Sequence, residues 1–304
     1  MKSGSFYNSD PWLKPYAGII NTRINKCVSK ERTLAGNGTL CDFALGHFYY
    51  GLHSTKNGWI FREWAPNATQ IFLTGTFSDW QEKQEYSLTR LNSHGDWEIH
   101  LSREELKHED LYKLSVYWEG GKGERIPSYA NRVIQDDVTK IFSAQVWNPP
   151  KKHRWKIKDF KPANTALMIY EAHIGMASHL EKVGTYREFT DDVLPIIKKA
   201  GYNTIQLMAI QEHPFYGSFG YHVSNFFAAS SRFGTPEELK ELIDKAHQEG
   251  IAVIMDLVHS HSVKNVMEGL ALFDGHPGQY FHTNDRRLHR ACDSLCFEIG
   301  RAHV

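Results

Sequence analysis

Excess charge of either sign is absent from this 304-residue chain, in which 35 Lys and Arg balance 35 Asp and Glu. Bulk attraction to nucleic acid or to an anionic membrane is therefore excluded, and we expect neither partner. Long apolar runs are absent too. The longest, 251–258, is interrupted by Asp256 and is far shorter than the roughly 20 residues of a membrane-spanning helix. The first residues contain no apolar core typical of a secretion signal, so the sequence predicts a cytoplasmic protein.

Cysteine is scarce and scattered. The chain contains Cys27, Cys41, Cys292 and Cys296 and shows no secretion signal, so we expect reduced thiols rather than disulfides. The C-x-x-x-C spacing of the last two has no second pair to complete a zinc site. The sequence therefore predicts no bound metal.

Tryptophan is absent after position 155. All eight tryptophans lie at or before Trp155, whereas 11 of the 17 histidines lie at or after His173. Flat aromatic side chains therefore mark the first half and titratable side chains the second. This difference, together with the length of the chain, predicts two domains.

The first half has the pattern of an antiparallel β-sandwich. Short segments with alternating apolar and polar residues occur at 58–64, 70–74, 96–101 and 112–118, and turn-forming residues separate them. We assign the sandwich to residues 46–150. Residues 1–45 are predicted to form an N-terminal helical extension, and the basic segment 151–164, which follows two prolines, is predicted to be a linker.

The second half, 165–304, alternates strands and helices. Apolar segments at 167–170, 204–208 and 251–255 predict three strands. Two helices are predicted between them, each beginning at a capping box, Thr185-x-x-Glu188 or Thr235-x-x-Glu238. This order predicts parallel strands joined by right-handed crossovers. In such folds ligands bind at the carboxyl ends of the strands.

Polar side chains gather after the third strand, in Asp256-Leu-Val-His259-Ser-His261. Three interpretations remain open. Asp256 and His261 bind a polar ligand at the mouth of a barrel, or the two histidines bind a metal ion, or the side chains only satisfy loop backbone groups. The metal interpretation is the weakest because no further ligands are evident. The aromatic loop that contains Tyr221 likewise either binds a ligand or forms its own packing core.

Several motifs together resemble one family. They are Trp64-Ala-Pro-Asn-Ala68, Gly75-Thr-Phe-Ser-Asp-Trp80, Tyr170-Glu-Ala-His-Ile-Gly175, Ile205-Gln-Leu-Met-Ala-Ile-Gln-Glu-His213, Ser218-Phe-Gly-Tyr-His-Val-Ser-Asn-Phe-Phe227 and Asp256-Leu-Val-His-Ser-His261. With them the chain resembles the glycogen (1,4-alpha-glucan) branching enzymes of glycoside hydrolase family 13. Segment 64–80 resembles their family 48 carbohydrate-binding module. The combination differs from ordinary alpha-amylases and from debranching hydrolases.

The resemblance implies a fold and a set of binding residues. It implies a multidomain β plus α/β architecture, in which an antiparallel carbohydrate-binding β-sandwich precedes the first part of a TIM (β/α)8 barrel. The implied partner is an alpha-glucan such as glycogen, and no cofactor is implied. Tyr221, Asp256 and His261 match sugar contacts at the cleavage site, and Trp64, Pro66, Gly95 and Asp96 match glucan contacts of the module. Trp80 and Trp97 are expected to be mainly structural.

The resemblance also implies an activity. Branching enzymes are transferases that cleave an alpha-1,4-glucan and move the segment to a 6-hydroxyl, in glycogen biosynthesis. The retaining double displacement needs two carboxylates about 5–5.5 Å apart. In the family both follow later strands, so we expect the nucleophilic Asp and the acid/base Glu beyond Val304 and predict a truncated enzyme whose segment 298–304 matches nothing in the family. The alternative is an inactive fragment that only binds alpha-glucan.

Overall fold

The computed structural model describes residues 9–290 and 292–298, so most of the unusual segment 298–304 lies outside the described residues. The chain divides into two compact units, residues 1–49 with 299–304, and residues 50–298.

The described part of the first unit is helical. Its elements are η1 (Lys14–Tyr16), α2 (Ala17–Ala35), α3 (Leu40–Phe43) and α4 (Gly46–Tyr49). Helix α3 begins at a capping box in which Thr39 and Asp42 exchange side chain to backbone hydrogen bonds. Helix α2 buries none of its 19 residues. None of the helices in residues 9–290 and 292–298 combines the length and the apolar character needed to cross a membrane.

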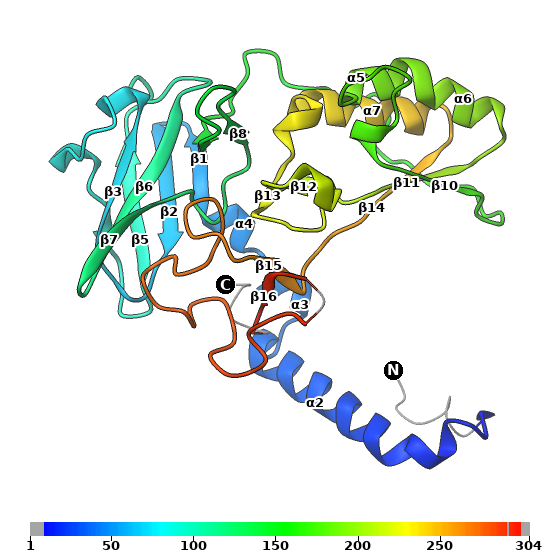
Figure 1. The fold of residues 1–304 in the computed structure, drawn as a ribbon, viewed down its shortest axis with the longest axis horizontal. Helices are drawn as coiled ribbons and strands as arrows, with labels where there is room; N and C mark the ends of the chain where they lie inside the picture. The colour runs from blue at the N-terminus through cyan, green and yellow to red at the C-terminus, as the bar shows by residue number, and fades with distance from the viewer. Residues whose placement is uncertain (1–8, 291, 299–304) are drawn as a thin grey trace. The chain divides into compact units, whose positions relative to one another are not determined.

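The second unit begins with two antiparallel sheets (Figure 1). One contains β1 (Gly51–Thr55), β2 (Gly58–Trp64), β5 (Asp96–Leu101) and β4 (Thr89–Arg90) in that order; the other contains β3 (Ala68–Gly75), β6 (Leu111–Trp118), β9 (Phe142–Gln145) and β8 (Val133–Gln135), with β7 (Gly121–Arg125) also on β6. The ring of Phe61 on β2 meets the ring of Tyr112 on β6 edge to face, with centroids 6.3 Å apart. Because both rings are buried, this contact lies in the core between the sheets.

Three parallel strands follow, β10 (Ile169–Ala172), β11 (Thr204–Leu207) and β14 (Ala252–Met255), with β11 in the middle (Figure 1). The predicted parallel arrangement is therefore confirmed. Both predicted capping boxes are present, and the second begins α7 (Pro236–Gln248). Outer-strand side chains are open to solvent: Ile254 and Met255 on β14 are 39% and 43% exposed.

The first predicted helix differs from a simple α-helix. It runs from α5 (Tyr186–Glu188) through a π-helical turn, η5 (Phe189–Val193), into α6 (Leu194–Lys199). The π-turn ends at Val193, two residues before Pro195, whose ring and missing N–H do not fit a regular α-helical ladder. The proline therefore changes the helical type and leaves the helix running on.

The connecting segments of the second unit contain further short elements. They are η2 (Thr76–Ser78), η3 (Gln84–Tyr86), η4 (Ile174–Met176), β12 (Gln211–Glu212), η6 (Tyr216–Ser218), β13 (Asn225–Ala229), η7 (Ser231–Phe233), β15 (His261–Val263) and β16 (Ser294–Cys296). The loop from β15 to β16 packs on the sandwich, where buried Asp274 accepts hydrogen bonds from the backbone and side chain of Asn67, both at 2.8 Å. Arg125 donates to the carbonyl of Leu272 at 2.7 Å. These contacts join the sandwich to the loop between β15 and β16.

Candidate functional site

A hydrogen-bonded group of side chains lies at the carboxyl ends of the parallel strands. Asp256 directly follows β14, and its backbone N–H donates to the carbonyl of Leu207 on β11 at 3.0 Å. Its carboxylate accepts one hydrogen bond from Gln206 Nε2 at 2.9 Å and another from the Tyr221 hydroxyl at 2.8 Å. Both carboxylate oxygens are thus oriented by neutral donors from neighbouring segments.

Tyr221 acts in this group as a neutral donor. Burial, the hydrogen bond to Asp256 and the charge of that carboxylate together raise the pKa of Tyr221 to about 12. The phenol therefore keeps its proton throughout the physiological range and remains available to Asp256.

His261 is joined to the same group at the start of β15. Its Nε2 lies 3.1 Å from the backbone carbonyl of Tyr221, and its Nδ1 lies 2.9 Å from Ser260 Oγ. Burial lowers the pKa of His261, and the nearby His289 lowers it too, so the ring is neutral at pH 7. Because a carbonyl only accepts, Nε2 carries the proton and Nδ1 accepts from the Ser260 hydroxyl. Since Ser260 is exposed, a ligand hydroxyl can take its place.

His259 takes no part in this group. It is exposed, and its Nδ1 lies 3.2 Å from the nearby carbonyl of Leu257. Within residues 9–290 and 292–298, no three His, Cys, Asp or Glu side chains are grouped as metal ligands.

Gln206 was missed by the sequence analysis. It sits in the apolar segment Thr204–Leu207, and its position looks like an ordinary strand position. A polar residue in the middle of a short buried strand was the available signal, because such a side chain needs a hydrogen-bond partner.

The sandwich residues predicted to bind glucan lie side by side. Trp64 at the end of β2 pairs in register with Asp96 at the start of β5. Gly95 has φ +93°, and a Cβ there would lie 2.2 Å from the Cα of Pro66, so only glycine permits this approach. The Trp64 indole donates to the carbonyl of His94 at 3.0 Å, and its ring meets the edge of Tyr280 at 5.5 Å. Trp64 is thus half-buried, with its N–H occupied.

Trp80 provides a second aromatic surface on the other sheet. Asp79 and Trp80 both adopt left-handed backbone, with φ 56° and 59°, which is uncommon for residues with side chains. The Trp80 ring is 40% exposed, and Lys113 Nζ lies 5.7 Å above its centre. Trp97, by contrast, is 4% exposed and donates to the carbonyl of Ala65. The expectation of a structural role is therefore confirmed for Trp97 but not for Trp80.

Comparison with protein-family models finds two matches. Residues 49–130 match carbohydrate-binding module 48 (isoamylase N-terminal domain), and residues 169–277 match the alpha amylase catalytic domain. The predicted architecture of a β-sandwich module followed by the first part of a catalytic barrel is confirmed.

Curated relatives agree with this result. The chain is 44% identical to the 1,4-alpha-glucan-branching enzyme of Dictyostelium discoideum over 98% of its own length, and 44% identical to that of Yarrowia lipolytica over 97%. It spans 44% of the length of each of these relatives. The resemblance to branching enzymes is therefore confirmed over nearly the whole of this chain.

Solved structures share the fold at lower identity. The catalytic module of the pneumococcal glycogen-degrading virulence factor SpuA matches with a TM-score of 0.66 at 19% identity, over 83% of this chain and 43% of that one. The pullulanase from Bacillus acidopullulyticus matches with a TM-score of 0.61 at 22% identity, over 77% of this chain and 32% of that one.

Proposed function

We propose that this chain is the glucan-binding front part of a 1,4-alpha-glucan branching enzyme, a transferase of cytoplasmic glycogen biosynthesis. The proposed parts are an extension at 1–45, a sandwich at 46–150, a linker at 151–164 and a partial barrel at 165–304. The structure groups residues 46–49, which form α4, with the extension. The observation that carries the proposal is the joined group of Asp256, Tyr221 and His261 at the carboxyl edge of parallel strands.

This group suits a sugar better than a metal or a charged ligand. It offers one anionic acceptor, one phenol and one neutral imidazole, which together match the alternating donors and acceptors of sugar hydroxyls. In the proposed enzyme, Tyr221 stacks on the sugar ring, His261 contacts a hydroxyl and Asp256 keeps the group in place. We assign the nucleophile and the acid/base to no carboxylate of this chain.

The sandwich supplies glucan affinity away from the barrel. We assign glucan contacts to the group of Trp64, Pro66, Gly95 and Asp96, and a second platform to Trp80, because a flat exposed ring stacks on the apolar face of a sugar. Each ring is expected to contribute about 1 kcal/mol, which corresponds to roughly a fivefold change in affinity.

Calorimetric titration with maltoheptaose tests this assignment. Trp64→Ala and Trp80→Ala are each expected to weaken binding about fivefold, whereas Trp12→Ala, which removes an 86% exposed ring outside the sandwich, leaves it unchanged. Equal affinity in all four proteins would reject the sandwich sites.

The second candidate function is glucan binding without catalysis. The sandwich favours it, because the 40% exposed ring of Trp80 offers a sugar a flat stacking surface that needs no catalytic carboxylate. An iodine-stain assay on amylose separates the two functions, since only a branching enzyme shifts the absorbance of the complex.

A further inference from the structure

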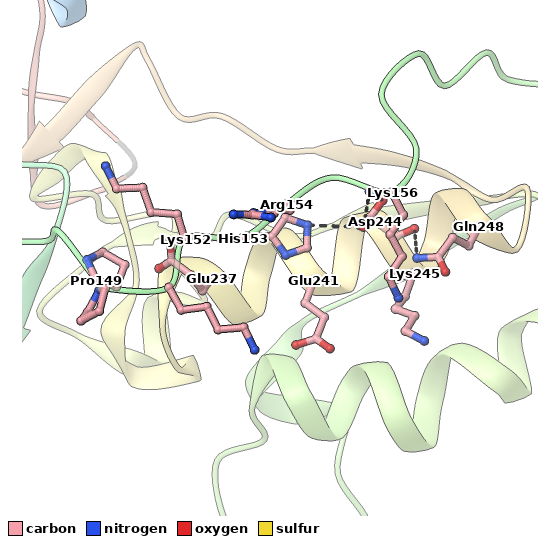
Figure 2. Close-up of a pocket in the computed structure, with 12 residues that line it drawn as sticks. Pro149, Lys152, His153, Arg154, Lys156, Glu237, Glu241, Asp244, Lys245 and Gln248 are labelled. Atoms are coloured by element: carbon pink, nitrogen blue, oxygen red, sulfur yellow. Dashed lines mark hydrogen bonds and ion pairs between the residues drawn. The ribbon is translucent and has the colours of Figure 1, made fainter.

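A cavity outside both glucan sites lies between the linker and helix α7. Its volume is about 890 Å³, which falls in the range of small-molecule pockets. Linker residues from Pro149 to Lys156 form one wall and side chains of α7 form the other (Figure 2). Neither the group of Asp256, Tyr221 and His261 nor the group of Trp64, Pro66, Gly95 and Asp96 contributes a lining residue.

The linker wall is fixed in place by a buried carboxylate. Asp244 on α7 is 1% exposed and accepts hydrogen bonds from the backbone N–H groups of Lys156 at 2.9 Å and Ile157 at 3.0 Å. His153 Nε2 lies 3.4 Å from the same carboxylate. Burial alone would raise the pKa of Asp244, but these N–H groups outweigh it and lower the pKa, so Asp244 stays ionised. Farther along, Phe160 stacks on His247 with ring centroids 4.0 Å apart.

The carboxylates around the cavity already have partners. Glu237 accepts hydrogen bonds from the Trp147 indole and from Lys240, and Glu241 pairs with Arg187 at 3.1 Å. Asp244 is occupied by the linker. Glu237 and Glu241 are therefore already paired with Lys240 and Arg187, whereas Asp244 keeps its charge because its backbone N–H donors are neutral.

The cations that line the cavity, by contrast, form no ion pairs among the described residues. Lys151, Lys152 and Arg154 on the linker and Lys245 on α7 line the cavity, and none forms an ion pair within residues 9–290 and 292–298. Figure 2 shows labelled cations from both walls around the same space. In a chain with zero net charge, four unpaired cations in one hollow are a local excess.

An aromatic hollow adjoins the basic one. Trp155, Phe160 and His247 line it, and its volume is about 440 Å³. The Trp155 ring is 40% exposed and packs edge-on against His153, which itself lines the basic cavity. A flat ring therefore lies next to the unpaired cations.

We propose that the linker cavity binds a phosphate monoester carried on a sugar. The phosphate carries a charge of about −1.5 to −2 at pH 7, which Arg154 and the lysines match, and guanidinium groups hold phosphate oxygens with paired hydrogen bonds. The sugar ring then stacks on Trp155. A long polyanion such as nucleic acid fits less well, because the α7 wall that faces the cationic linker contains three carboxylates, Glu237, Glu241 and Asp244. The phosphate is borne either by a free sugar or by a glucan chain, and the site is independent of the branching activity.

Calorimetric titration of the whole chain tests the proposal with inorganic phosphate, glucose 6-phosphate, a phosphorylated maltooligosaccharide, glucose and a single-stranded oligonucleotide. The phosphorylated sugars are expected to bind, glucose to give no heat, and phosphate to bind more weakly because it makes no contact with Trp155. A glucan chain is the source if the phosphorylated oligosaccharide binds tighter than both glucose 6-phosphate and the same oligosaccharide without phosphate, and if Lys152→Gln with Arg154→Gln removes the gain over the unphosphorylated one. Equal binding of the two oligosaccharides, beside binding of glucose 6-phosphate, identifies a free sugar.

Paired variants separate the cavity from general charge attraction. Lys152→Gln with Arg154→Gln is expected to weaken glucose 6-phosphate binding at least tenfold. The control Lys161→Gln with Lys199→Gln removes the same charge outside the cavity and is expected to change binding less than twofold. Equal losses in both pairs, equal binding of glucose, or tightest binding of the oligonucleotide would each overturn the proposal. Matching thermal melts establish that all the proteins are folded.

Discussion

Glu63 makes the stability of the sandwich fall as the pH rises. Its side chain on β2 is fully buried and accepts hydrogen bonds from the backbone N–H of Ser128 at 2.8 Å, from the Ser128 hydroxyl and from the N–H of Trp64 at 2.9 Å. Burial raises the pKa of Glu63 to about 7, against these hydrogen bonds, which by themselves would lower it. The folded protein therefore holds this proton where the unfolded chain has lost it.

The sign and size of the Glu63 contribution to stability follow from the linkage between proton binding and folding. The folded pKa of about 7 lies above the ordinary value of 4.5, so the folded state binds more protons between these pH values. Its contribution is fully present below pH 4.5 and is lost as the pH rises through 7. At about 1.4 kcal/mol per pH unit, the loss is about 3 kcal/mol. Buried His173 and His213 have lowered pKa values and act in the opposite direction, losing stability as the pH falls.

The substitution Glu63→Gln isolates this effect. Glutamine cannot ionise, so the free energy of unfolding of the variant should gain about 3 kcal/mol relative to the wild type between pH 4.5 and pH 7.5. The histidine contributions are common to both proteins and cancel in the difference. At pH 4.5 the variant should be the less stable, because the amide NH₂ replaces an acceptor needed by Ser128.

Urea titrations followed by tryptophan fluorescence measure this difference, since the sandwich contains Trp59 and Trp97 and no tryptophan follows position 155. Glu85→Gln, at an exposed carboxylate, is the matched control and should run parallel to the wild type across the whole range. A constant difference between Glu63→Gln and the wild type from pH 4.5 to pH 7.5 would refute the reasoning, because it would show that Glu63 is ionised throughout.

Three substitutions test the second half. Leu242→Ala, at a fully buried position of α7, should lower the free energy of unfolding by about 2–5 kcal/mol in urea; a loss below 1 kcal/mol would contradict tight packing. Asp244→Ala frees the N–H groups of Lys156 and Ile157, so trypsin should cut the linker faster, and an unchanged cleavage rate would show that other contacts hold it. Ile254→Lys puts a charge on an exposed strand, so the monomer fraction in gel filtration should rise; no rise would exclude self-association there.

Features that depend on residues close together in the sequence were predictable, whereas features that depend on tertiary packing were not. The capping boxes at Thr185 and Thr235 depend on residues three apart, and both were predicted correctly. The parallel pairing of β10, β11 and β14 followed from the alternation of strands and helices. The π-turn before Pro195 was not predictable, because several backbone arrangements accommodate a proline and tertiary packing selects among them.

Trp80 shows a second limit of sequence reasoning. Its exposure depends on two consecutive residues in left-handed backbone, Asp79 and Trp80, and neither is a glycine that would signal such a turn. The contact of Asn67 with Asp274 joins residues 207 positions apart and leaves no local pattern either. Aromatic content predicted that rings would matter in the sandwich, but only the fold decides which ring faces solvent.

The hydrogen bonds of Asp256 hold the side chains of the proposed sugar site in one arrangement. A carboxylate held by Gln206 and Tyr221 gains orientation from two neutral donors without losing its charge, whereas an ion pair would neutralise it. Hydrogen bonds to a charged group contribute about 1.5–3 kcal/mol each, enough to fix one rotamer at the strand end. Because the Tyr221 backbone carbonyl also holds His261, displacing the segment that carries Tyr221 would disturb all three side chains at once. This shared dependence on Tyr221 is what makes the three residues one site.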